Sequence, residues 1–178
     1  MFKFIKISSL LSIFFERLNA QNNLNKQNLA SICACYPMQE TSINLSSKNI
    51  KTIDPATFTG IASLQRLYLD SNQISSINPA TFTGLTSLQT LYLYSNQISS
   101  IDPATFKGLT FLQILGLSSN KISSIHPATF KGLTSLQELY LHYNQISSID
   151  PPTFYGKNFK MIFDEYRVVS LLGLRSSR

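Results

Sequence analysis

The strongest constraint on this chain is that its sequence repeats every 24 residues. Four columns advance by that step: Phe58, Phe82, Phe106, Phe130 and Phe154; Pro55, Pro79, Pro103, Pro127 and Pro151; Leu67, Leu91, Leu115 and Leu139; Asn72, Asn96, Asn120 and Asn144. Self-similarity at one short period over most of a chain is typical of a solenoid, in which each unit forms one coil. Since a single coil cannot bury its own apolar face, the coils must stack and both ends need covering.

Each unit combines a short strand with a turn. The alternation in Leu67-Tyr68-Leu69 predicts a strand whose leucines face the core while the tyrosine faces the other, open side. In the segment Asp102 to Phe106 a capping acid precedes a proline, and Gly108 follows as a stop, which predicts about one helical turn on the convex side. We expect the asparagine column to be buried, with its amides bonded to the backbone of the turn between strand and helix.

A full unit reads Leu64-x-x-Leu67-x-Leu69-x-x-Asn72-x-Ile74-x-x-Ile77, and the pattern covers about residues 41–154. It resembles the leucine-rich repeat family, specifically its 24-residue class. The resemblance implies an α/β solenoid, a right-handed arc with a short parallel β-sheet on the concave face and short helical turns on the convex side. It also implies that proteins are bound through the concave sheet.

The first 20 residues have the pattern of a signal peptide. Met1 to Lys6 supplies two positive charges, Ile7 to Phe15 is an uncharged apolar run, and Ala20 is a small residue after which cleavage could occur. The alternative is an amphipathic N-terminal segment packed on the domain.

Residues 21–53 are expected to form an N-terminal cap and a first, atypical coil, because Ile43-Asn44-Leu45 aligns with Leu67-Tyr68-Leu69. Just before it, Cys33-Ala34-Cys35 resembles the middle of the four-cysteine cap of extracellular leucine-rich repeat proteins, including variable lymphocyte receptors. The outer two positions hold Leu29 and Leu45, so we expect apolar packing to hold the cap. Free thiols or an intermolecular disulfide remain open for Cys33 and Cys35.

After the repeats of residues 54–154 the pattern is lost, and residues 155–178 form a divergent tail. At the 24-residue step, leucine positions fall on Lys157, Lys160, Phe163 and Glu165. The apolar spacing is instead helical, at Phe159, Ile162, Phe163, Tyr166, Val169 and Gly173. This predicts an amphipathic helix laid over the last coil as a cap. The alternative is an accidental tail on a truncated or misread product.

The distribution of charge argues against nucleic-acid binding. The formal net charge is +6, but residues 54–154 carry four basic and five acidic side chains, so the excess lies at the two ends. Nucleic-acid binding needs lysine and arginine gathered on the recognition face. Outside the N-terminus the longest apolar run, Val168 to Leu174, is far shorter than the roughly 20 residues of a membrane helix, so we expect no membrane span.

Little in the sequence suggests catalysis. His126 shares the capping column with Asn78 and Asp102, and is expected to cap a turn less well than they do. His142 lies on the open face, roughly 14 Å from Asp70 three coils away, which is too far for a catalytic pair or a shared metal. We therefore expect no enzyme activity, no cofactor and no metal.

The residues at the outward-facing strand positions differ from repeat to repeat, whereas the residues of the predicted core are nearly the same in each repeat. We predict that the following residues bind a ligand: Arg66, Tyr68, Asp70, Thr90, Tyr92, Tyr94, Ile114, Gly116, Ser118, Glu138, Tyr140, His142 and Tyr143. Five of them are tyrosines, which give large contact area at low entropic cost, and Gly116 opens a notch between them. Asn44-Leu45-Ser46 is a glycosylation sequon at the first strand.

These features predict a secreted recognition module, or a fragment of a receptor ectodomain, that binds a protein or a glycan on the concave face. The sheet covers roughly 300 Å², against about 800 Å² for a standard partner patch. The partner is therefore small, or the loops beside the sheet contribute, or the affinity is modest. The alternatives are an intracellular adaptor of the same fold and a structural fragment without a partner of its own.

Overall fold

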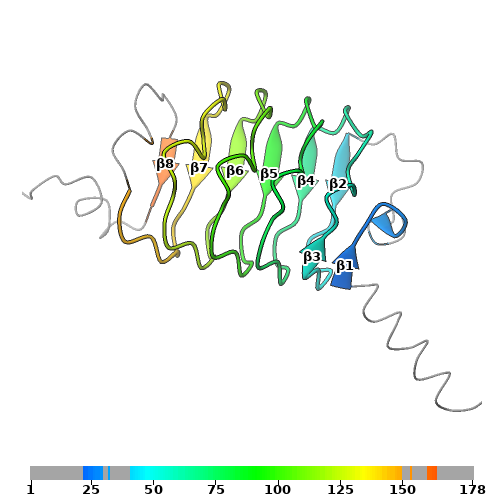
Figure 1. Cartoon of the computed structure of the whole chain (residues 1–178), viewed down its shortest axis with the longest axis horizontal. Helices are drawn as coiled ribbons and strands as arrows, with labels where there is room; N and C mark the ends of the chain where they lie inside the picture. The colour runs from blue at the N-terminus through cyan, green and yellow to red at the C-terminus, as the bar shows by residue number, and fades with distance from the viewer. Residues whose placement is uncertain (1–21, 30–31, 33–40, 150–152, 154–159, 164–178) are drawn as a thin grey trace, which may run out of the picture.

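The computed structural model of the chain describes residues 22–29, 32, 41–149, 153 and 160–163. They form a solenoid whose coils stack side by side (Figure 1). One strand from each coil joins a six-stranded parallel sheet, with neighbours in the order β2 (Ser42–Asn44), β4 (Arg66–Tyr68), β5 (Thr90–Tyr92), β6 (Ile114–Gly116), β7 (Glu138–Tyr140) and β8 (Lys160–Ile162). From β4 to β7 the register advances by the repeat length, because Leu67, Leu91, Leu115 and Leu139 are successive partners.

The core is built from the repeated apolar columns. Leu67 and Leu69 are fully buried, whereas Tyr68 between them is partly exposed, which confirms the predicted alternation. The phenylalanine column forms a continuous stack with ring centroids 6.4 Å apart at each step from Phe58 to Phe130. Identical residues at identical places in each coil therefore pack against one another.

The asparagine column lies inside the coils as predicted. The Asn96 Nδ2 group donates to the carbonyl oxygens of Leu69 and Leu93 at 2.9 and 3.1 Å, and its Oδ1 accepts from the Ile74 N–H at 3.0 Å. Asn72, Asn120 and Asn144 repeat this pattern. Each amide therefore bonds to the preceding coil as well as to its own.

The convex side differs from the prediction, because hydrogen-bonded turns replace the expected helical turns. In the third coil the Thr105 N–H donates to Asp102 O at 3.0 Å and the Leu109 N–H donates to Phe106 O at 3.2 Å, both spanning three residues. No helix occurs between residues 54 and 149. Gly108, at φ 88°, reverses the chain before a helical turn with four-residue bonds can form.

The capping column behaves as predicted within these turns. The Ala104 N–H donates to Asp102 Oδ1 at 2.7 Å, and the Ala128 N–H donates to His126 Nδ1 at the longer distance of 3.1 Å. His126 thus performs the task of the aspartate in its own coil.

At the N-terminal end a small second sheet covers the first coil. It pairs β1 (Asn23–Leu24) with β3 (Thr52–Ile53) in parallel. Leu24 and Leu29 are fully buried in the common core, so apolar packing is present at this end. The predicted signal peptide, Cys33 and Cys35 lie outside the residues that the structure describes.

The C-terminal end overturns the predicted helix at residues 160–163, because β8 is a sixth strand of the large sheet. Leu139 pairs with Met161, so this last step is 22 residues long instead of 24. Met161 and Phe163 pack against the core, while Ile162 between them joins the register position of Tyr140. The rest of the predicted helix lies outside the described residues.

Candidate ligand-binding face

Strand register arranges the predicted site residues in columns. The outward-facing strand residues, together with the two positions that follow each pair of core leucines, are called the open face below. The first column is Ser42, Arg66, Thr90, Ile114, Glu138 and Lys160, and the second is Asn44, Tyr68, Tyr92, Gly116, Tyr140 and Ile162. The third is Asp70, Tyr94, Ser118 and His142. The structure therefore brings the predicted residues onto one side of the sheet.

Lys160 and Ile162 belong to this face although the sequence reasoning assigned them to a helix. The only signal for a strand is the short apolar run Met161-Ile162-Phe163, which fits a strand if the last coil is two residues shorter but fits a helix equally well. Asn44, the predicted glycosylation site, is exposed at the opposite end of the second column.

Three of the predicted residues are less open than expected. Asp70 is 7% exposed and Ser118 is 8% exposed, and Gly116 is buried beneath neighbouring rings. The Asp70 carboxylate accepts hydrogen bonds from the Ser46 hydroxyl at 2.7 Å and from the Ser71 hydroxyl at 3.3 Å. Asp70 is therefore a fixed negative charge just under the surface.

The aromatic residues of the open face form two clusters. In the first, Tyr92 contacts Tyr68 and Tyr94, with ring centroids 5.4 Å apart in both pairs. In the second, His142 lies 6.3 Å from the Tyr140 ring and 5.0 Å from the Tyr143 ring, with edge-on geometry in both cases. The β6 coil separates the clusters and contributes only Gly116, Ser118 and Ser119.

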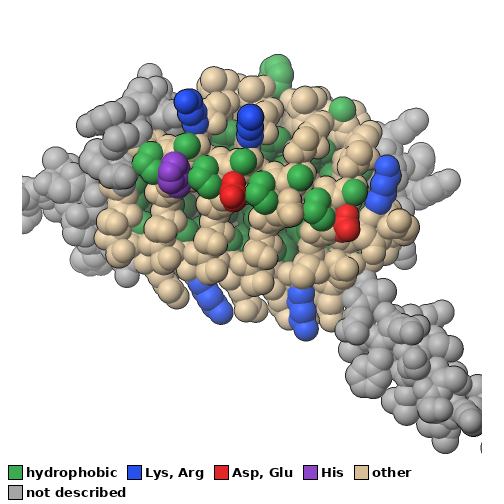
Figure 2. All heavy atoms as spheres, in the orientation of Figure 1, with side chains coloured by type: hydrophobic (Ala, Val, Ile, Leu, Met, Phe, Trp, Pro, Cys, Tyr) green, Lys and Arg blue, Asp and Glu red, His purple; other side chains and the backbone are tan. Residues whose placement is uncertain are grey.

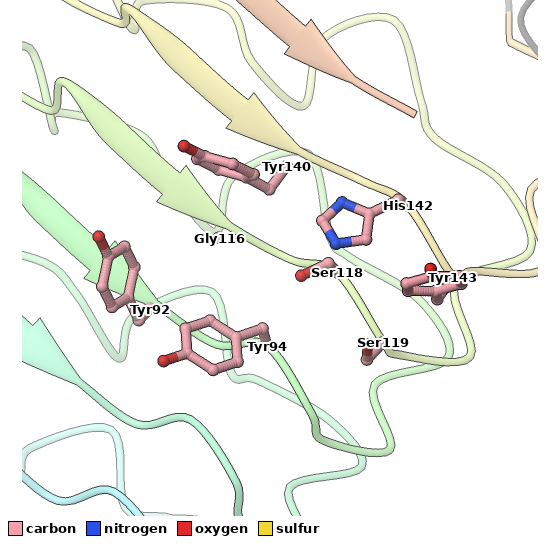
Figure 3. Close-up of a pocket in the computed structure, with 8 residues that line it drawn as sticks. All are labelled: Tyr92, Tyr94, Gly116, Ser118, Ser119, Tyr140, His142 and Tyr143. Carbon is pink, nitrogen blue, oxygen red and sulfur yellow. The ribbon is translucent and has the colours of Figure 1, made fainter. Parts of the chain in front are cut away.

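The pocket between these clusters has a volume of about 410 Å³. Its lining consists of Tyr92, Tyr94, Gly116, Ser118, Ser119, Tyr140, His142 and Tyr143. Figure 3 shows Tyr92 and Tyr94 on one side, Tyr140, His142 and Tyr143 on the other, and the small residues between them. A Cβ atom at Gly116 would lie 3.2 Å from Tyr92 Cδ1 and 3.3 Å from Tyr94 Cδ1, so the missing side chain lets these rings approach the floor.

Tyr143 stands in an unusual backbone position. Its φ is 56°, in the left-handed region, and its side chain is 69% exposed. Serines occupy the same place in the preceding coils, with φ near 55°: Ser71, Ser95 and Ser119. A bulky side chain is rare in this conformation, so the rim of the pocket carries local strain that the other coils reduce with a smaller residue.

Burial and nearby carboxylates together raise the pKa values of three tyrosines on this face. The Tyr140 hydroxyl donates to Glu138 Oε2 at 2.5 Å, and this hydrogen bond, with burial, raises the pKa of Tyr140 to about 12. Burial raises the pKa of Tyr92, with smaller contributions from Tyr68, Glu138 and Asp70. Burial, followed by the Asp70 carboxylate, raises the pKa of Tyr94. The phenols are therefore neutral hydrogen-bond donors at physiological pH, beside two negative charges.

The described residues include no cluster of three or more His, Cys, Asp or Glu side chains that could hold a metal ion. Figure 2 shows one face of the molecule, on which the charged side chains are few and most of them lie apart. Within the described part of the chain, no helix is long and apolar enough to cross a membrane.

A leucine-rich repeat family model matches this chain in four overlapping segments, residues 41–98, 63–122, 87–146 and 110–158. The chain belongs to the leucine-rich repeat family. Its predicted family is therefore confirmed, and so is the stacked parallel sheet, whereas the resemblance of its N-terminal cap to that of variable lymphocyte receptors stays a prediction. A search of curated proteins finds no match.

Solved leucine-rich repeat structures have the same fold. A chain of the LRIM1/APL1C complex superposes with a TM-score of 0.62 at 26% identity, over 72% of this chain and 27% of that one. Internalin C2 from Listeria monocytogenes superposes with a TM-score of 0.57 at 33% identity, over 69% of this chain and 51% of that one. The chain thus spans about a quarter of the length of the first neighbour and about half of the length of the second. Leucine-rich repeat proteins generally mediate protein–protein interactions and are typically non-enzymatic.

Proposed function

We propose that this chain is a non-enzymatic recognition module that binds a protein ligand on its open face. The observation that carries the proposal is the pocket of about 410 Å³ between two aromatic clusters, on a face whose residues differ from coil to coil. Tyrosine is favoured in binding surfaces because it offers a large, rigid contact area and a hydroxyl that adapts to its partner. The partly exposed tyrosines Tyr68, Tyr92, Tyr94 and Tyr140 fit that role.

The size of the face limits what it can bind alone. Six strands about 4.8 Å apart give a sheet only about 24 Å wide, and a standard interface covers about 800 Å² on each partner. We therefore expect one ligand side chain to anchor in the pocket while the rest of the partner contacts the turns beside the sheet. The LRIM1/APL1C neighbour is itself a protein complex, which supports a protein ligand over a glycan.

A panel of purified extracellular proteins and glycans, screened against the immobilised full chain, tests the proposal. The variant Tyr92→Ala/Tyr140→Ala removes one ring from each cluster, and we expect it to lose the ligands that the wild type captures. Phe111→Ala is the matched control, because Phe111 is an exposed aromatic residue outside the open face at 61% exposure. The proposal would be contradicted if the double variant, with unchanged thermal unfolding, still bound the ligands of the wild type. If the wild type captured only glycans from the panel, the ligand would be a carbohydrate instead of a protein.

We also propose that the chain is exported, either as a secreted protein or as part of a receptor ectodomain. The apolar run of residues 7–15 and the exposed sequon at Asn44 support this. Mass spectrometry of protein made in a secretory eukaryotic host should find residues 1–20 removed and a glycan on Asn44. An intact Met1 with an unmodified Asn44 would favour the intracellular adaptor.

A further inference from the structure

The floor of the pocket is a gap in the second column of the open face, where one tyrosine is replaced by Gly116. This gap is called the slot below. Tyrosine occupies the second column on β4, β5 and β7, and Gly116 interrupts it on β6. The strands on either side, β5 and β7, are about 9.6 Å apart, since neighbouring strands are about 4.8 Å apart. A flat group between two rings needs about 7 Å, twice the contact distance of about 3.5 Å between carbon atoms. The Tyr92 and Tyr94 rings lean over Gly116 from the β5 side and narrow this gap, but the remaining pocket of about 410 Å³ is large enough for one planar group between the clusters.

The surroundings of the slot favour a positive charge. None of the residues that line it is lysine or arginine. On one side the Glu138 carboxylate accepts a hydrogen bond from the lining residue Tyr140, and on the other side burial, followed by the Asp70 carboxylate, raises the pKa of the lining residue Tyr94. Arg66, Lys160, Glu138 and Asp70 all lie outside the lining, and Lys160 is the register partner of Glu138. The two acids differ from the two bases in that each acts on a tyrosine of the lining. Aromatic ring faces also attract cations, most strongly where water is partly excluded.

We propose that the slot over Gly116 binds the guanidinium group of an arginine side chain from a protein ligand. This inference rests on the proposed function and names the chemistry of its anchor. Arginine fits better than lysine because its charged group is planar, stacks on aromatic faces and is less strongly hydrated. The guanidinium lies between the Tyr92 and Tyr140 clusters, and Glu138, which accepts a hydrogen bond from Tyr140, supplies a negative charge behind that ring.

An NMR titration of the full chain with two small probes tests the charge requirement. The probes are N-acetyl-L-arginine methylamide and N-acetyl-L-citrulline methylamide, which have nearly the same shape but differ in charge. We expect the arginine probe to shift the Gly116 amide signal and to bind about tenfold more tightly than the citrulline probe. Equal affinities would overturn the inference, and so would shifts that leave Gly116 unaffected.

Two variants test the geometry and the charge separately. Gly116→Tyr fills the slot with the residue that its column carries on both neighbouring strands, and the Tyr92 and Tyr94 rings must shift to make room for its Cβ. We expect the chain to fold, which circular dichroism checks, and to lose the arginine probe. Glu138→Gln keeps an acceptor for the Tyr140 hydroxyl but removes the charge, and should weaken the arginine probe about fivefold without affecting the citrulline probe. Phe111→Ala should leave both affinities unchanged. A folded Gly116→Tyr variant that still binds the arginine probe would refute the slot.

The outcomes separate this inference from the proposed function. If panel ligands depend on Tyr92 and Tyr140 but the chain shows no preference for the arginine probe, the binding face stands and the arginine anchor is wrong. If the arginine probe binds as expected while the panel ligands bind the double variant as well as the wild type, the slot recognises a guanidinium group, but the proposed protein-binding face, and with it the arginine of a protein ligand, is wrong.

Discussion

The buried columns of this solenoid repeat the same residues from coil to coil, whereas the open face carries different residues on the same backbone. Inside, Phe106 and Asn96 have the same contacts as their equivalents one coil away, so a change there would disturb packing or hydrogen bonds that every coil needs. Outside, the same register positions hold tyrosine, glycine and histidine without any change in the strand ladder. The comparison teaches that the repeated residues maintain the fold, and that the departures from the repeat, Gly116 above all, create the pocket.

The largest effect should come from breaking the phenylalanine stack. Phe106 is 1% exposed and stacks on Phe82 and Phe130. Phe106→Ala should lower the free energy of unfolding by about 4 kcal/mol, because it removes a buried ring and leaves a cavity. Urea unfolding followed by circular dichroism measures the loss. The exposed Phe111→Ala should change stability by less than about 0.5 kcal/mol, and equal effects at both sites would contradict the contrast between inside and outside.

Breaking the asparagine column should have the next largest effect. Asn96→Ala leaves the Ile74 N–H and the carbonyl groups of Leu69 and Leu93 without their side-chain partner. Because unpaired buried groups cost about 1–3 kcal/mol each, we expect a loss of about 3 kcal/mol in the same unfolding experiment. Gln97→Ala, at the exposed neighbouring position, is the control and should cost little. A loss below about 1 kcal/mol for Asn96→Ala would show that water replaces the amide.

On the open face, the pairing of Tyr140 with Glu138 should be visible in a titration. Glu138→Gln should lower the pKa of Tyr140 from about 12 toward its ordinary 10.0, because it removes the carboxylate that accepts a hydrogen bond from the phenol. In the wild type this phenol contributes stability that is complete below pH 10.0 and is lost as the pH rises toward about 12. NMR of ¹³C-labelled tyrosine measures the shift.

Tyr94 serves as the internal reference in that titration. Its pKa is raised by burial and then by Asp70, so it should not move when Glu138 is changed. An unchanged Tyr140 would contradict its pairing with Glu138, and a shifted Tyr94 would show that the charge of Glu138 also acts on that tyrosine.

The smallest effect should come from repairing the weakest cap on the convex side. His126 accepts from the Ala128 N–H at 3.1 Å, whereas Asp102 accepts its bond at 2.7 Å. His126→Asp should therefore raise the free energy of unfolding by about 0.5 kcal/mol, measured by thermal unfolding. The reciprocal change Asp102→His should cost a similar amount, and a destabilising His126→Asp would contradict the equivalence of the two turns.

Periodicity was enough to predict the interior. Leucine, phenylalanine and asparagine recur at a fixed step, and each has one physical role that a stacked coil must supply, so their burial and bonding follow from the pattern. The same periodicity concealed β8, because a fixed 24-residue step assigned leucine positions to Lys160 and Phe163 while the coil had shortened by two residues. The prediction of helical turns on the convex side was wrong because a capping acid, a proline and a glycine suit tight turns as well as helices.

The candidate site was predictable in its position but not in its shape. Outward strand positions identified the tyrosines and the gap at Gly116. That Tyr92 and Tyr94 lean over this glycine, and that Asp70 is buried against Ser46, depends on side-chain packing between coils, which no spacing in the sequence reveals. The left-handed backbone conformation of Tyr143, which serines adopt at the same place in other coils, was likewise not predictable from the spacing.

The most direct test of the account is a residue-by-residue NMR map of the chain with a protein ligand from the panel bound. The account predicts that the largest amide shifts fall on Tyr92, Tyr94, Gly116, Tyr140 and His142, and that the turns holding Asp102 and His126 stay unchanged. Shifts concentrated on those convex turns, with the β5 to β7 face undisturbed, would contradict it.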